Sequence, residues 1–365
     1  MRVLFLANIP SPYRVDFFNE LGKHCQLTVT FEGLSASDRD DKWKAGKVEH
    51  FKAIFLKGMR VRSDAFLCLG ILRILKQKWD HIIIGGYSTP TTMLAIEYLR
   101  MHKRPFFLEA DGGMVADDSP LKYRLKRHFI SAANGWFSSG KMTTDYLVHY
   151  GAQADKCHTY PFTSLMRRDI EQAASETVDK AALKATLNIP HGPMILSIGQ
   201  FIHRKGFDIL LDAAALLPRN VRICIVGGEA TEEYLQQRQK LELTNVQFVG
   251  FQTKQELSMY YKAADCFVLP TREDIWGLVI NEAMMYGLPV ITTNRCVAGM
   301  ELITNEENGY IVPVNDAAAL ATAINNILSD GILAQRMATN NLKKISKYSI
   351  EEMAKAHIDS FGRNA

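Results

Sequence analysis

The sequence has no long hydrophobic run and no regular spacing of cysteines or histidines. No apolar stretch approaches the roughly 18 residues that a membrane-spanning helix needs. The apolar segment Val3 to Ala7 is too short for a signal peptide, because Pro10 follows it closely. The six cysteines lack CxxC spacing and HExxH is absent, which predicts reduced thiols and no metal site. We therefore expect a cytoplasmic protein that holds no metal and no cofactor.

Charge is distributed unevenly between the two halves of the 365-residue chain. Residues 1–163 contain 23 Lys and Arg against 16 Asp and Glu, whereas residues 164–365 contain 20 against 23. A basic first half favours an anionic membrane surface or an anionic acceptor as a partner. Nucleic acid is not expected, because it calls for a denser basic stripe with interleaved aromatic residues.

Short apolar runs of strand length alternate with helical patterns throughout the chain, which is typical of doubly wound parallel sheets. The loop Asn8 to Arg14 after the first run lacks GxGxxG, so a dinucleotide is not indicated. Arg14 is either a ligand for an anionic acceptor or a solvent-facing helix residue. The predicted strands cover residues 2–7, 27–31, 81–84, 105–108, 135–138, 194–198, 221–226, 246–249, 266–269 and 290–292.

Three segments carry helical patterns of particular interest. Ser63 to Lys78 predicts one amphipathic surface helix, and Leu333 to Phe361 predicts helix throughout. Leu121 to Ile130 interleaves five basic residues with apolar ones. As a helix, this last segment either rests on anionic headgroups or packs against the sheet.

The stretch Leu269 to Pro289 is a predicted strand, loop and helix around which the other motifs are arranged. A helix that begins near Gly277 leaves the amides of Gly277, Leu278 and Val279 suited to an anion. Glu282 lies one turn deeper and could accept hydrogen bonds from two ribose hydroxyls. Asp274 precedes the helix and is better suited to sugar hydroxyls than to phosphate, and Glu273 beside it could take that role.

This stretch resembles the family 4 retaining glycosyltransferases of the GT-B fold, whose signature is two glutamates separated by seven residues. Here the pair is Asp274 and Glu282. The alternative is an ordinary helix start with an acidic first turn. The resemblance implies an α/β protein with two Rossmann-like domains facing across a cleft. Residues 1–165 would bind the acceptor, residues 166–346 would bind the nucleotide sugar, and a helix in 347–365 would cross back to the first domain.

A second motif, Gly199-Gln200 followed by Arg204-Lys205-Gly206, also resembles this family, which usually has Gly-Arg and then Lys-Gly. Lys205 matches, whereas Gln200 replaces the arginine and Arg204 could supply the missing charge. In the family these cations reach the donor diphosphate. Cations are needed there because cleavage of a sugar–phosphate bond develops negative charge on the departing group.

Two further turns match the family in order and approximate spacing, whereas the first half of the chain matches only in layout. The resemblance places Gly227 near the donor and assigns the turn Gly250-Phe251-Gln252 to the base edge. At the end of the strand 105–108, relatives often carry a histidine or carboxylate that faces the reacting sugar, and Asp111 stands near that place. Asp-Gly-Gly is also a plain turn signal, so both interpretations of Asp111 remain open.

The resemblance implies a metal-independent, retaining transfer of a hexose-like sugar from a UDP- or GDP-linked donor to a glycan or lipid-linked acceptor. Bacterial surface polysaccharide synthesis is the expected setting, with peripheral attachment at the inner face of the membrane. The alternatives are a non-catalytic partner subunit of the same fold, suggested by Gln200 and Asp274, and a sugar-nucleotide epimerase.

Overall fold

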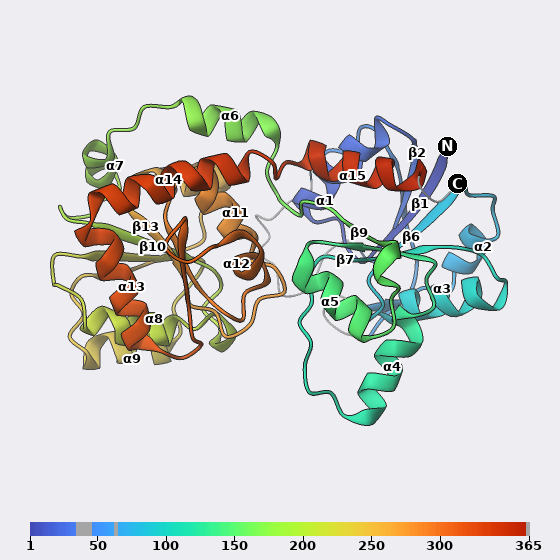
Figure 1. The fold of residues 1–365 in the computed structure, drawn as a ribbon, viewed down its shortest axis with the longest axis horizontal. Coiled ribbons are helices and arrows are strands. Elements are labelled where there is room, and N and C mark those ends of the chain that lie inside the picture. Colours follow the sequence, from blue (N-terminus) through green and yellow to red (C-terminus); the bar gives the residue numbers. More distant parts are fainter. Residues whose placement is uncertain (34–45, 62–64, 363–365) are drawn as a thin grey trace. The chain divides into compact units, whose positions relative to one another are not determined.

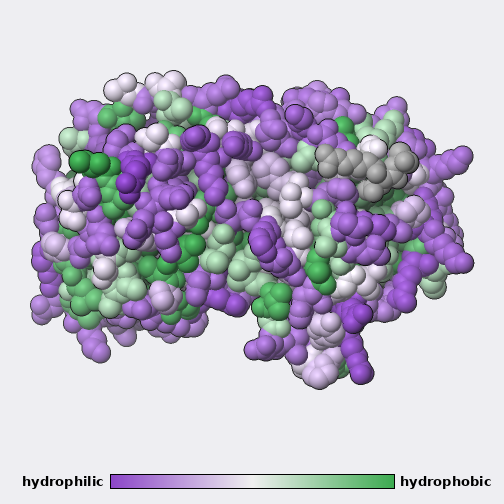
Figure 2. All heavy atoms as spheres, viewed as in Figure 1, coloured by the Kyte–Doolittle hydropathy of each residue, from purple (hydrophilic) through white to green (hydrophobic). Residues whose placement is uncertain are grey.

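The chain forms two compact units in the computed structural model, which describes residues 1–33, 46–61 and 65–362. Unit 1 contains Met1–Met166 together with Tyr348–Ala365, and unit 2 contains Arg167–Lys347. Figure 1 shows helices around a central sheet in each unit. Hydrophilic side chains cover most of the face in Figure 2, because the apolar runs of the sequence are largely buried in the two cores.

Unit 1 is built on a seven-stranded sheet whose order is β3-β2-β1-β6-β7-β8-β9, with every neighbouring pair parallel. The near-continuous apolar runs explain this, since parallel strands are covered on both faces. The strands are β1 (Arg2–Ala7), β2 (Gln26–Phe31), β3 (Lys52–Phe55), β6 (His81–Gly85), β7 (Phe107–Ala110), β8 (Gly135–Ser138) and β9 (Cys157–Thr159). The helices are α1 (Pro12–Gly22), α2 (Ile71–Leu75), α3 (Pro90–Met101), α4 (Pro120–Ile130), α5 (Lys141–His149), the 3-10 turn η1 (Ala154–Lys156) and α15 (Ile350–Gly362).

The predicted helix from Ser63 to Lys78 is wrong over most of its described length. Strand β5 (Phe66–Leu67) pairs with β4 (Met59–Arg60), and only α2 is helical; residues 62–64 lie outside the described part. The Thr91 hydroxyl donates to Phe66 O at 2.6 Å, and Cys68 N donates to the same hydroxyl oxygen at 3.0 Å. These bonds to Thr91 take backbone groups that a continuous helix would need.

Unit 2 has a six-stranded parallel sheet in the order β12-β11-β10-β13-β14-β15. Its strands are β10 (Met194–Ile198), β11 (Arg222–Val226), β12 (Val246–Val249), β13 (Cys266–Leu269), β14 (Val290–Thr293) and β15 (Gly309–Val312). Its helices are α6 (Arg167–Ser175), α7 (Lys180–Thr186), the 3-10 turn η2 (His203–Lys205), α8 (Phe207–Ala215), α9 (Glu232–Lys240), α10 (Lys254–Ala263), α11 (Leu278–Met285), α12 (Val297–Leu302), α13 (Ala317–Ser329) and α14 (Gly331–Ile345).

Each sheet reverses its strand order once, beside its first strand. In unit 2, β10 lies between β11 and β13, and in unit 1, β1 lies between β2 and β6. Connections that leave such a point in opposite directions open a crevice at the carboxyl ends of the strands, where open α/β sheets bind ligands. The loops after β10 and β13 are therefore the expected ligand loops of unit 2.

The predicted helix from Leu333 to Phe361 is interrupted, because α14 ends at Ile345 and α15 begins at Ile350. Ile350 N donates to Leu165 O at 2.8 Å, so the chain joins unit 1 at this break. Helix α15 then packs against α1 (Figure 1). Within the described ranges, no single helix combines the length and apolar character needed to cross a bilayer, although the bent pair α13 and α14 passes when taken together.

Candidate functional site

The loops after β10 and β13 of unit 2 are tied to each other by backbone contacts. Arg272 N donates to Arg204 O at 2.8 Å, and the Thr271 hydroxyl donates to the same oxygen at 2.9 Å. Gly206 has φ 69°, and a Cβ there would lie 2.1 Å from Pro270 O. Only glycine allows this left-handed conformation and this close approach. The loop that carries Lys205 is thus fixed against the loop that carries Asp274.

The two predicted cations converge on one predicted carboxylate. Lys205 Nζ donates to Asp274 Oδ2 at 2.6 Å, and Arg204 Nη1 lies 3.5 Å from Asp274 Oδ1. A Cβ on Gly199 would lie 3.3 Å from Lys205 Cδ, so the lysine side chain passes over this glycine. Arg204 is 44% exposed, whereas Lys205 and Asp274 are 13% and 12% exposed. Positive charge is therefore held at the carboxyl ends of β10 and β13.

The amino end of α11 adds backbone donors to the same edge of the sheet. Gly277 precedes the helix with φ 101°, and the first turn has no side-chain cap. The amides of Leu278 and Val279 have no acceptor inside the helix, and the helix dipole places partial positive charge there. A Cβ on Gly277 would lie 2.9 Å from Cys296 Sγ, so a side chain is excluded. The arrangement suits a phosphate group.

Glu282 lies in the second turn of α11 and is oriented by Tyr261, which was not among the predicted site residues. Tyr261 donates to Glu282 Oε2 at 2.8 Å, and its ring stacks on Tyr286 with centroids 5.2 Å apart. Burial raises the pKa of Tyr261 well above its ordinary value, and the Glu282 carboxylate adds to the rise. Tyr261 therefore remains a proton donor that fixes the carboxylate.

The remaining predicted donor-site residues follow β10, β11, β12 and β13. A Cβ on Gly227 would lie 2.0 Å from Gly199 O, so these two turns touch through their backbones. Gln252 Nε2 donates to Gly250 O at 3.3 Å and to Phe251 O at 3.2 Å. Its amide thus already binds the backbone carbonyls of the turn that was predicted to contact the nucleotide base. The side chains of Gln200 and Glu273 are exposed, and Glu273 Oε2 lies 3.4 Å from Arg295 Nη2.

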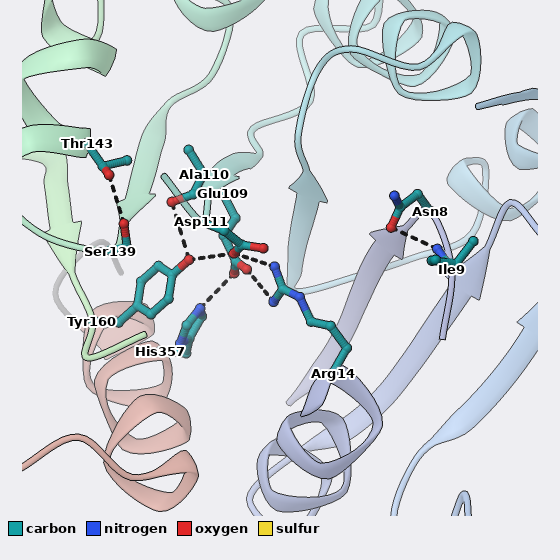
Figure 3. Close-up of polar contacts among 10 residues, drawn as sticks. All are labelled: Asn8, Ile9, Arg14, Glu109, Ala110, Asp111, Ser139, Thr143, Tyr160 and His357. Carbon is teal, nitrogen blue, oxygen red and sulfur yellow. Dashed lines mark hydrogen bonds and ion pairs between the residues drawn. The ribbon is translucent and has the colours of Figure 1, made fainter. Parts of the chain in front are cut away.

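Asp111 belongs to a separate cluster in unit 1 (Figure 3). Arg14 donates to Glu109 Oε1 at 2.6 Å and to Asp111 Oδ1 at 2.5 Å. The Tyr160 hydroxyl donates to Asp111 Oδ1 at 2.9 Å, and His357 Nε2 lies 2.8 Å from Glu109 Oε2. Glu109 is sealed from solvent, whereas the Asp111 side chain is 29% exposed. Of the two carboxylates, Asp111 is therefore the one that solvent or a ligand can contact.

The two carboxylates of this cluster have opposite pKa shifts. Burial raises the pKa of Glu109, but Arg14 and His357 outweigh it and lower the pKa to about 2. Burial also raises the pKa of Asp111, Glu109 adds to the rise, and Arg14 and Tyr160 only partly oppose it. A carboxylate whose pKa is raised accepts a proton more readily than a free one, which suits proton transfer.

Two expectations for unit 1 need correction. Arg14 is not a solvent-facing helix residue, because its guanidinium is buried between two carboxylates. Strand β7 continues through Ala110, so Glu109 lies within the strand, whereas the predicted strand ends at Leu108. The i, i+2 spacing of Glu109 and Asp111 was the available signal, since alternate residues of an extended segment face the same side. Tyr160 and His357 have no local sequence signal.

Residues 179–344 match the model of the family described as "Glycosyl transferases group 1". The D-inositol 3-phosphate glycosyltransferase of Xylanimonas cellulosilytica is 26% identical over 244 residues, 64% of this chain and 58% of the relative. The lipopolysaccharide core biosynthesis glycosyltransferase LpsE of Rhizobium meliloti is 30% identical over 184 residues, 50% of this chain and 52% of the relative. The chain thus spans little more than half the length of these relatives.

Solved structures resemble the chain over its whole length. HepE of Anabaena in complex with UDP aligns over 100% of both chains, with a TM-score of 0.79 and 18% identity. Its complex with UDP-glucose aligns over the same extent, with a TM-score of 0.77 and 17% identity. The predicted α/β architecture is confirmed: the chain has the GT-B fold of glycosyltransferases, and its residues 179–344 match glycosyl transferases group 1.

Proposed function

We propose that the chain is a retaining, metal-independent glycosyltransferase that moves a sugar from a nucleotide diphosphate to a glycan or lipid-linked acceptor. Unit 2 binds the donor, and unit 1 binds the acceptor. The family match over residues 179–344 supports the transferase class. UDP is the first choice of nucleotide, since HepE, a structural neighbour, was solved with UDP and UDP-glucose. GDP is the alternative.

The observation that carries this proposal is the convergence of Lys205, Arg204 and the first amides of α11 at the strand-order reversal of unit 2. In the proposed complex, the donor diphosphate takes the place of Asp274 as the partner of Lys205. Glu282, oriented by Tyr261, accepts from the ribose hydroxyls. Asp274 or Glu273 then accepts from hydroxyls of the transferred sugar.

In the proposed reaction, the bond between the anomeric carbon and the diphosphate oxygen breaks while the acceptor oxygen bonds to the same face of that carbon. The acceptor proton passes to the departing diphosphate. Lys205, Arg204 and the α11 amides stabilise the negative charge that develops there, which is the work a metal ion does in other transferases. Asp111 would hold the acceptor hydroxyl, and its raised pKa favours proton sharing.

An anionic membrane surface is the proposed partner of α4, at the inner face of the membrane. Only Phe129 and Ile130 of this helix are buried, whereas Leu121 and Leu125 are 79% and 49% exposed. Lys122, Arg124 and Arg127 are also exposed, so apolar and cationic groups share an exposed surface. Co-sedimentation with phosphatidylserine vesicles, compared with phosphatidylcholine vesicles, would test this partner. Equal recovery with both would contradict it.

Nucleotide binding and turnover by Lys205→Ala test the donor site. Calorimetry should show that UDP binds the wild type and the surface control Lys343→Ala alike but binds Lys205→Ala at least about tenfold more weakly. Release of UDP from UDP-glucose should fall on the order of 100-fold. Unchanged affinity and turnover in Lys205→Ala would remove the donor-site assignment. Nucleotide binding without turnover by the wild type would favour the non-catalytic subunit.

A further inference from the structure

His357 is a buried residue of α15 whose two ring nitrogens both face oxygen acceptors. Nδ1 lies 2.8 Å from Met353 O in the preceding turn, and Nε2 lies 2.8 Å from Glu109 Oε2 (Figure 3). Neither a backbone carbonyl nor an ionised carboxylate can donate, so both contacts are hydrogen bonds only if the ring donates from both nitrogens. The ring also stacks on Phe137 with centroids 4.3 Å apart, which fixes its orientation.

The cluster therefore contains two donor side chains, Arg14 and His357, and two carboxylates, Glu109 and Asp111. Arg14 uses Nη1 for Glu109 and Nη2 for Asp111, so one guanidinium serves both acids. His357 supplies the second donor, to the other carboxylate oxygen of Glu109. A buried carboxylate is costly unless it is hydrogen-bonded, so loss of one donor favours displacement or protonation of a carboxylate.

We propose that His357 is a positioning residue of the acceptor site. Its bond to Glu109 Oε2 holds that carboxylate so that Nη2 of Arg14 remains available to orient Asp111. His357 does not touch the acceptor and acts through two intermediate side chains. This inference rests on the proposed function only in calling the neighbourhood of Asp111 the acceptor site.

Loss of the bond to His357 should change the protonation of Asp111 before that of Glu109. Arg14 alone would then serve two carboxylates, and one of them would take up a proton at a higher pH than before. Glu109 has a pKa lowered to about 2, whereas the pKa of Asp111 is raised, so Asp111 takes up that proton first. The groups that face Asp111 are Arg14 from α1, Glu109 from β7 and Tyr160 after β9.

Two amide substitutions distinguish the effect of the hydrogen bond to Glu109 from the effect of the hydrogen bond to Met353 O. His357→Asn places its amide nitrogen near the position of Nδ1, so it keeps the contact with Met353 O and loses the contact with Glu109. His357→Gln reaches the position of Nε2 and keeps a donor for Glu109. Carboxyl carbon NMR of protein labelled with 13C at aspartate Cγ follows the titration of Asp111, with Asp111→Asn assigning the signal.

The titration midpoint of Asp111 should rise by about half a pH unit or more in His357→Asn and remain near the wild-type value in His357→Gln. Wild-type midpoints in both variants, or equal shifts in both, would overturn the inference. UDP affinity measured on the same samples should be unchanged, because the proposed donor site lies in unit 2. His357→Phe, which retains the ring contacts, replaces His357→Asn if that variant does not fold.

Turnover separates this inference from the proposed function. If Asp111→Asn releases UDP from UDP-glucose at the wild-type rate while the midpoint still moves in His357→Asn, His357 positions Asp111 but Asp111 has no part in cleavage of the donor. If Asp111→Asn loses turnover and His357→Asn leaves the midpoint unchanged, Asp111 keeps its proposed role and the inference about His357 fails.

Discussion

Units 1 and 2 each contain a parallel sheet with one strand-order reversal. They differ in how deeply their charged side chains are buried and in how these side chains are paired. In unit 2, Arg204, Lys205 and Asp274 come from two adjacent loops, and Arg204 is 44% exposed. In unit 1, Arg14 and Glu109 are buried and bound to each other. We expect the charges of unit 2 to exchange partners with a ligand and those of unit 1 to maintain a geometry. The same fold thus supplies one exchangeable and one fixed electrostatic site.

Replacing the central cation of each unit should produce the largest contrast. Arg14→Met leaves Glu109 and Asp111 without their shared partner, so the free energy of unfolding of unit 1 should fall by about 3–5 kcal/mol. Lys205→Met should cost less, about 1–2 kcal/mol, because Arg204 remains 3.5 Å from Asp274 as a second partner. Differential scanning calorimetry of the two variants measures the contrast. Similar losses of stability in both would break the comparison.

Acid should affect unit 1 through Glu109. Its pKa is lowered from 4.5 to about 2, so the ionised carboxylate stabilises the folded form above about pH 4.5 and this contribution is lost as the pH falls toward 2. The shift corresponds to about 3 kcal/mol. Between about pH 5 and pH 3, the wild type should lose more unfolding free energy than Glu109→Gln. Parallel pH profiles in urea denaturation would contradict the buried ion pair.

Alanine substitution at two glycines of unit 2 should give the smallest difference in stability. Gly277 has φ 101° and no room for a side chain beside Cys296, so Gly277→Ala should destabilise unit 2 by about 1–3 kcal/mol. Gly250 has no neighbouring atom within 4 Å of an added Cβ, so Gly250→Ala should change stability by less than about 0.5 kcal/mol. Thermal unfolding of both variants compares them. Equal melting temperatures would show that the turn before α11 is more adaptable than its geometry indicates.

The sequence predicted unit 2 well because its information is local. The bounds of β10, β12 and β13 agree with the predicted strands, since buried parallel strands are nearly continuous apolar runs. Lys205 and Asp274 were expected near one ligand because strand, loop and helix follow one another along the chain. The structure brings their side chains together, while the roles assigned to them remain predictions.

Unit 1 was less predictable because its cluster joins distant positions. Arg14 lies 95 positions from Glu109, and His357 lies 248 positions from it. The predicted strand ends at Leu108, whereas Glu109 is buried within β7, which only its partners make acceptable. No spacing rule connects these residues.

The position of α15 determines the order in which the units can be completed on a ribosome. Residues 167–347 lie between the two segments of unit 1, so unit 2 has its full sequence while the nascent chain still lacks α15. Contiguous domains can fold as they emerge. Arg14 and Glu109 must wait for His357, which makes unit 1 the later of the two to mature.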